Sequence, residues 1–157
     1  MPIIRANDVT TEEPNKPDPI LGNYTAKLFS DSGGLDQFGA FTETLPPGSK
    51  SSLRHWHQTE DEMVFMLAGV VIVHEGDTST PLHPGDSATF KAGVPLGHFL
   101  ENTSAADATY LIIGTRAASD VITYPDHDCV LHFDRTTGAR RYVTRDGEPT
   151  VSPYGRK

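Results

Sequence analysis

Three side chains suited to binding a metal ion lie close together in the middle of the chain. His55 and His57 are separated by one residue, and Glu62 follows after a short polar stretch. Side chains of an extended strand point alternately to its two faces, so both imidazoles would share one face and Trp56 would take the other. Neutral imidazole nitrogens and a carboxylate oxygen are ligands that divalent transition metals accept. The spacing therefore indicates a candidate metal site.

A fourth donor and a competing acid extend this group. His98 belongs to the stretch 97–102, and it completes a set of three histidines and one carboxylate if that stretch lines the same interior. Glu60 competes with Glu62 for the carboxylate position, because the alternation of side chains cannot be followed across a turn. A His-x-His pair is also common outside metal sites, so the spacing alone leaves a solvent-facing role open.

Charged residues near this group indicate what a bound molecule could look like. Lys50, Arg54 and Lys91 would suit an anionic substrate such as a carboxylate or a phosphate; alternatively, all three are surface charges. Glu60 and Glu101 are the nearby acids that could serve as a catalytic base. We therefore treat Arg54 and Lys91 as candidate substrate-binding residues and the two glutamates as candidate catalytic residues.

The elements that must position these residues are short strands separated by turns. The chain has 157 residues, with 14 Gly and 12 Pro, and no stretch shows sustained helical periodicity. Short apolar or alternating runs predict strands at 26–30, 39–45, 62–67, 70–75, 79–82, 87–90, 97–102, 109–115, 130–134 and 141–145. So many strands without helices between them predict an all-β sandwich or barrel.

Turn residues support this division into strands. Pro84 and Gly85 occupy the second and third positions of the segment 83–86, which predicts a type II turn. The segment 75–77 predicts a tight hairpin, and the segment 134–138 predicts a longer hairpin loop.

The distribution of prolines and strands divides the chain into three parts. Residues 1–25 carry several prolines and predict an extended N-terminal arm, with an edge strand at Ile3–Ile4. We expect the barrel over 26–118. Residues 119–157 then form a C-terminal β extension that packs on the barrel.

The composition argues against several classes of protein. The formal net charge is −8 and 36% of the residues are hydrophobic, which is typical of a folded chain without the basic face that duplex binding needs. Cys129 is the only cysteine, so no internal disulfide can form. The longest apolar run, 63–73, contains Gly69 and is too short to span a bilayer, and the N-terminal residues lack a signal-peptide core. We expect a cytoplasmic protein with no nucleic-acid or membrane partner.

Two segments of the chain resemble the two sequence motifs of the cupin superfamily. The first motif is matched by Gly48, His55, His57, Glu62 and Gly69, and the second by Gly85, Gly93, His98 and Asn102. The match departs from the family pattern in three places. Gly48 lies one residue too far from His55, Lys91 stands in place of a proline, and 94–97 lengthens the loop before His98 by two residues.

The resemblance implies both a fold and a metal site. The fold is a double-stranded β-helix, also called a jelly roll or cupin barrel, with a single pair of motifs. The site is one divalent ion (iron, manganese, zinc or nickel) bound by His55, His57, Glu62 and His98, and the family spacing favours Glu62 over Glu60. Cupins of this size are often dimers, so the resemblance also implies a homodimer.

Three kinds of function fit such a site. A metal with open coordination positions supports isomerisation or epimerisation of a sugar or sugar phosphate, or a dioxygenase reaction. Alternatively, the barrel binds a sugar or small acid without catalysis, as a sensor or storage protein. A purely structural metal fits less well, because structural zinc sites usually close with four ligands and often use cysteine. In the first two cases the partner is a small polar or anionic molecule.

Overall fold

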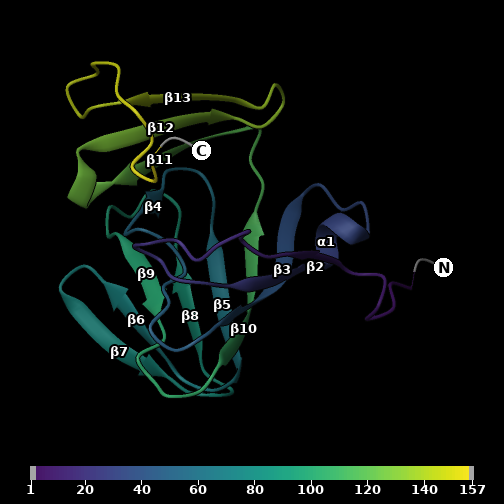
Figure 1. Ribbon diagram of the computed structural model, residues 1–157. Helices are drawn as coiled ribbons and strands as arrows, with labels where there is room; N and C mark the ends of the chain where they lie inside the picture. Colours follow the sequence, from purple (N-terminus) through teal and green to yellow (C-terminus); the bar gives the residue numbers. More distant parts are fainter. Residues whose placement is uncertain (1–2, 156–157) are drawn as a thin grey trace.

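Antiparallel strands are the main regular elements of the structure, a computed structural model that describes residues 3–155 (Figure 1). The strands of the barrel are β1 (Thr10–Glu12), β2 (Thr25–Leu28), β3 (Phe38–Leu45), β5 (Glu62–Ala68), β6 (Val71–Glu75), β7 (Thr78–Leu82), β8 (Ser87–Phe90), β9 (His98–Glu101) and β10 (Ala108–Thr115). The other elements are β4 (Trp56–His57), β11 (Ser119–Tyr124), β12 (Cys129–Asp134), β13 (Ala139–Val143), the helix α1 (Phe29–Ser32) and the 3-10 turn η1 (Pro125–His127).

The barrel consists of two sheets that enclose one apolar core. One sheet has the strand order β1-β2-β3-β10-β5-β8, and the other has the order β7-β6-β9. Residues from both sheets, among them Met66, Val73, Leu100 and Tyr110, are buried together between them. This arrangement confirms the predicted all-β jelly roll.

Alternation along the strands decides what faces this core. In β10, Ala108, Tyr110 and Ile112 are buried, while the residues between them are more exposed. Burying one large apolar side chain is worth about 1.5–3 kcal/mol, so a one-residue slip of this strand would lose several such contributions. The register of β10 between β3 and β5 is therefore strongly determined, and the inward side chains of all three strands have defined positions.

Two turns predicted from the sequence are confirmed. In the segment 83–86 the Asp86 amide donates to the His83 carbonyl at 2.9 Å, and Gly85 has a φ of 95°, as a type II turn requires. Gly76 closes the hairpin between β6 and β7 with a φ of 53°.

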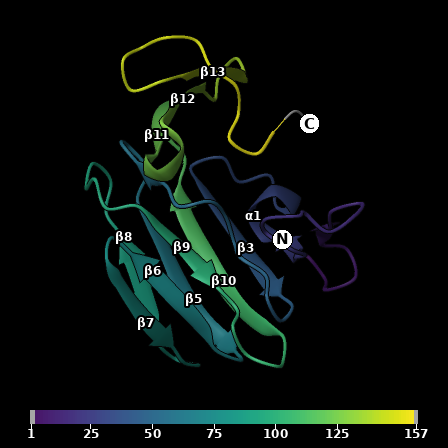
Figure 2. The same cartoon turned by 60° about the vertical axis from the view of Figure 1, so that its left-hand side comes forward.

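A third sheet lies at one end of the barrel, with the order β13-β12-β11-β4 (Figure 2). The short strand β4 joins it because Trp56 and His57 pair with Thr123 and Ile122 of β11. The sequence analysis placed strands close to β12 and β13 but missed β11. The segment after residue 118 therefore does more than pack on the barrel, because it hydrogen-bonds directly to the strand that carries His57.

The N-terminal arm and α1 differ from expectation. The edge strand predicted at Ile3–Ile4 is wrong, because β1 pairs with β2 further along the chain and Ile3 is 56% exposed. Residues 29–32 form the short helix α1 where a strand end and a loop were predicted, and the Ser32 hydroxyl donates to the Leu28 carbonyl at 2.6 Å. Neither helical segment within residues 3–155 is long and apolar enough to cross a membrane.

Gly69 and Gly138 offer a matched test of how tightly the barrel packs. Both have positive φ (75° and 73°), but a Cβ on Gly69 would lie 2.5 Å from the Asp107 carbonyl oxygen, whereas Gly138 has no atom within 4 Å of that position. We expect Gly138→Ala to lower the free energy of unfolding by about 1 kcal/mol through backbone strain alone. Gly69→Ala should lower it by about 3 kcal/mol or more, because backbone must also move. Urea denaturation measures both, and equal losses would contradict the packing argument.

Candidate metal centre

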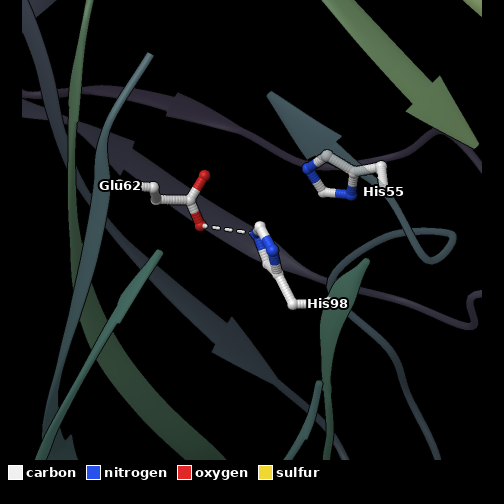
Figure 3. Close-up of side chains that lie close together, drawn as sticks. All are labelled: His55, Glu62 and His98. Carbon is white, nitrogen blue, oxygen red and sulfur yellow. Dashed lines mark ion pairs between the residues drawn. The ribbon is translucent and has the colours of Figure 1, made fainter. Parts of the chain in front are cut away.

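Three of the predicted ligands come together inside the barrel from separate elements (Figure 3). Glu62 begins β5, His98 begins β9, and His55 forms an isolated bridge with His98 through two backbone hydrogen bonds of 3.2 and 2.9 Å. Each side chain offers one ligand atom, and these atoms all lie within 4.8 Å of one another. Strands distant in the sequence thus hold two imidazoles and one carboxylate around a common point.

The surroundings of His98 fit a bound cation. The residue is 2% exposed, its ring stacks on Phe90 at 3.6 Å between centroids, and neither ring nitrogen has a hydrogen-bond partner of normal geometry among residues 3–155. An unsatisfied buried polar group costs about 1–3 kcal/mol. The nearest carboxylate atom is Oε1 of Glu62, 3.9 Å from Nε2. A divalent ion between these atoms would satisfy both groups.

Burial sets the protonation state of these histidines. Desolvation and the neighbouring imidazoles lower the pKa of His98 to about 3, and desolvation and His57 lower the pKa of His55 to about 4. Both rings are therefore neutral at physiological pH, which is the form that binds a metal. Desolvation also raises the pKa of Glu62, which lies in the same interior.

His57 lies beside this group and is held by a carboxylate of the third sheet. Its Nδ1 is 2.6 Å from Oδ2 of Asp120, and Oδ1 of Asp120 accepts from the amide and hydroxyl of Thr59 at 2.9 and 2.7 Å. Burial lowers the pKa of His57, but the hydrogen bond to Asp120 and the charge of Glu62 outweigh it, so the pKa is raised overall. A carboxylate on Nδ1 leaves Nε2 as the ligand atom, the usual arrangement of metal-binding histidines.

Asp120 is one of the site residues that the sequence analysis missed, together with Glu43, Arg116 and Arg135, which line a cavity beside the ligands. Asp120 is 3% exposed and lies on β11, the strand that was not predicted. The run of β-branched and aromatic residues at 121–124 is a strand signal in the sequence that could have placed it. His57, Glu60 and Asp120 also have ligand atoms within 4.8 Å of one another, but His57 and Asp120 are already joined by a hydrogen bond.

A cavity of about 280 Å³ adjoins the ligands. Its charged or titratable lining residues are Glu43, His55, Glu60, Glu62, Arg116 and Arg135. Oε1 of Glu60 accepts from Arg135 at 2.7 Å and from the Ala117 amide at 2.9 Å. Glu60 is therefore held by an arginine of the β12–β13 hairpin that also lines the cavity, whereas Glu62 is the carboxylate grouped with His55 and His98.

Glu101 does not lie in this cavity, contrary to its predicted role as a base. It is on β9, three residues after His98, and its side chain is on the opposite face of the strand. Its Oε2 is 2.9 Å from Nε2 of His74, and its Oε1 is 3.7 Å from Nζ of Lys50. These contacts tie Glu101 and Lys50 to the outer face of the barrel, because side chains alternate along β9.

The two predicted substrate-binding cations differ in position. Arg54 donates to the carbonyls of Gly76 and Gly97 at 2.8 and 3.3 Å and to Asp126 at 3.2 Å, so its guanidinium group connects loops instead of facing the cavity. Arg54 is not among the residues that line the cavity of His55 and Glu62, and its role in substrate binding stays a prediction. Lys91 is exposed and lines a small pocket that also contains His57 and His98.

Comparison with known proteins identifies the family of this fold. Residues 41–114 match the family model described as "Cupin domain". An oxalate-binding protein of Thermotoga maritima is 33% identical over 113 residues, which cover 71% of this chain and 91% of that protein. The chain belongs to the cupin superfamily.

Two solved cupin structures are similar over most of this cupin. A sugar phosphate isomerase from Silicibacter pomeroyi is 32% identical, with a TM-score of 0.85, and the match covers 96% of this chain and 98% of that chain. A putative sugar phosphate isomerase from Acidithiobacillus ferrooxidans is 25% identical, with a TM-score of 0.75, covering 83% and 81%.

Two of the three departures of this cupin from the family motifs lie together at one pocket. Lys91, in place of the motif proline, and Val94 and Leu96, in the lengthened loop, line the small pocket beside His57 and His98. Val94 and Leu96 are 39% and 48% exposed, so these two side chains do not enter the core.

Removal of the imidazoles tests the ligand assignment. We expect His57→Ala to weaken metal binding by more than about 100-fold, because loss of a ligand should exceed the effect of losing its outer partner. The His55→Ala, His57→Ala double variant should retain no stoichiometric metal. Elemental analysis after dialysis measures the content, with the exposed His83→Ala as control. Full occupancy in the double variant would refute the assignment.

Replacement of Asp120 tests whether the third sheet supports the site. Asp120→Asn keeps the volume but removes the carboxylate that fixes Nδ1 of His57, so we expect metal affinity to fall about 10–100-fold. Asp134→Asn is the matched control, because Asp134 caps the β12–β13 hairpin by accepting from the Thr137 amide. Competition with a fluorescent chelator measures the affinities. An Asp120→Asn protein that binds metal as tightly as the control would show that Asp120 has no such role.

Proposed function

We propose that this cupin is a metal-dependent isomerase that interconverts the aldose and ketose forms of a small anionic sugar, such as a sugar phosphate. The observation that carries the proposal is that the predicted ligands His55 and Glu62 share one cavity with two arginines. A divalent ion held by His55, His57, Glu62 and His98 would polarise a carbonyl group of the substrate. The similarity to a structure named as a sugar phosphate isomerase supports this reaction class.

The arginines are suited to hold the anionic end of the substrate. Arg116 contacts both carboxylate oxygens of Asp31 at 2.9 and 2.8 Å, and Arg135 contacts Glu60 at 2.7 Å. These ion pairs hold the guanidinium groups at the cavity edge. A guanidinium has five N–H donors, so each arginine retains donors for a phosphate or carboxylate.

Acid groups outside the ligand set favour an isomerase over a dioxygenase. A dioxygenase would use the same ligands with dioxygen beside the substrate, and it does not depend on a separate base. An aldose–ketose isomerase must move a proton between two neighbouring carbons, so it needs an acid–base group beside the bound sugar. Glu43 and Glu60 line the cavity without belonging to the predicted ligands, which supports the isomerase.

Binding of a small dicarboxylic acid is the second candidate. The relative from Thermotoga maritima is named an oxalate-binding protein, and this chain matches 91% of its length. The same cation and arginines would bind an oxalate-sized dianion without catalysis.

A substrate panel separates these functions. We expect metal-loaded protein to interconvert at least one aldose phosphate with its ketose, followed by proton NMR, and to act at least tenfold less efficiently on the unphosphorylated sugar because the arginines then lack their anion. Oxalate should not raise the melting temperature of the metal-loaded protein more than the sugar phosphate does. No turnover together with strong stabilisation by oxalate would favour the binding protein, and oxygen consumption with a small substrate would favour the dioxygenase.

A further inference from the structure

Glu43 is a buried carboxyl of the metal cavity that no predicted ligand role uses. It lies on β3, is 8% exposed, and its strand register places it opposite Tyr110 of β10. The Tyr110 hydroxyl, itself fully buried, donates a hydrogen bond to Oε1 of Glu43. Within residues 3–155, no lysine, arginine or histidine forms an ion pair with Glu43. The carboxyl therefore sits in the cavity with one neutral donor and no counter-charge.

This environment makes Glu43 able to exchange a proton near neutral pH. Burial raises the pKa of its carboxyl to about 7, the hydrogen bond from Tyr110 opposes this shift, and the charge of Glu62 adds to it. The titratable groups that face Glu43 are Tyr110, Glu62 and Tyr24, none of which is a cation. An acid–base catalyst works best when its pKa lies near the working pH.

The other two carboxyls of the cavity are less suited to this task. Glu62 is grouped with His55 and His98 as a predicted metal ligand. Glu60 already accepts from Arg135 and from the Ala117 amide. Glu43 is therefore the cavity carboxyl that has neither a cationic partner nor a place among the predicted ligands.

We propose that Glu43 is the catalytic acid–base residue of this cupin and that Tyr110 positions it. The proposal rests on the proposed isomerase function. The Glu43 carboxylate takes the proton from the carbon next to the aldose carbonyl. The C–H electron pair becomes a carbon–carbon double bond, and the carbonyl π pair moves to its oxygen. The hydroxyl group on the deprotonated carbon then passes its proton to that oxygen, and a carbonyl forms at the deprotonated carbon. Protonated Glu43 returns its proton to the former carbonyl carbon. No other reactant is consumed.

The Glu43→Gln variant tests the catalytic role. We expect its turnover of the aldose phosphate to fall at least about 100-fold, while metal content and the calorimetric affinity for the sugar phosphate change less than about threefold. Glu12→Gln, the same change at an exposed position of the same sheet, should keep full turnover. Thermal unfolding verifies that Glu43→Gln is folded, and Glu43→Asp, which retains a displaced carboxyl, should show intermediate turnover.

An infrared pH titration tests the roles of both residues without turnover. In metal-free wild-type protein a protonated carboxyl band should disappear as the pH rises through about 7. The carboxyl band that disappears near this pH should be absent in Glu43→Gln and present in Glu12→Gln. In Tyr110→Phe its midpoint should move to higher pH, because the donor that favours the carboxylate is lost. A role of Tyr110 in packing alone would leave the midpoint unchanged.

The possible failures are distinguishable. Near wild-type turnover in Glu43→Gln, or parallel loss of turnover and of substrate affinity, overturns the role of Glu43 while the isomerase function stands. A wild-type protein without a carboxyl that titrates near neutral pH also overturns that role. A wild-type protein that isomerises no sugar phosphate overturns the proposed function and the role of Glu43 together.

Discussion

The interior of the barrel keeps imidazole nitrogens and carboxylate oxygens away from water, and the site depends on this desolvation. His98 has no partner of normal hydrogen-bond geometry in the described chain, and its ring is stacked on Phe90. The sheets hold it there because Leu100, on the same face of β9, is 2% exposed and packs in the apolar core. A cation near Glu62 would offset the cost of burying both groups, so binding free energy and strand packing are coupled.

The third sheet completes the site through two contacts. Asp120 of β11 fixes the ring of His57, and Arg135 of the β12–β13 hairpin holds Glu60 at the cavity edge. Both contacts depend on the pairing of β4 with β11, which brings residues more than 60 positions apart within hydrogen-bond distance. The sheet beyond the barrel is therefore part of the functional architecture, and mutations in it should be interpreted with the site in mind.

Local patterns in the sequence predicted most strands and the residue types that could bind a metal. Long-range strand pairing determined which of these side chains meet. The two-residue period and the turn glycines placed β5 to β10 within a few residues, because these elements obey local rules. Alternation could not choose between Glu60 and Glu62 across a turn; the family spacing favoured Glu62, and the fold places Glu62 with His55 and His98. Alternation in the predicted strand 39–45 puts Glu43 on the same face as Phe41 and Leu45, but the hydrogen bond to Tyr110 arises only from the pairing of β3 with β10.

One physical cause acts in opposite directions on the two kinds of titratable group in this cavity. Desolvation disfavours every charged form, so it lowers the pKa of His55 and His98 and raises the pKa of Glu43. Neutral histidines bind metal, and a carboxyl that holds its proton near neutral pH can exchange it with a ligand. A cationic partner beside Glu43 would favour its charged form and so remove the second property. The absence of a cationic partner at Glu43 in the described chain thus matters as much as its burial, because burial beside an arginine would yield a fixed anion.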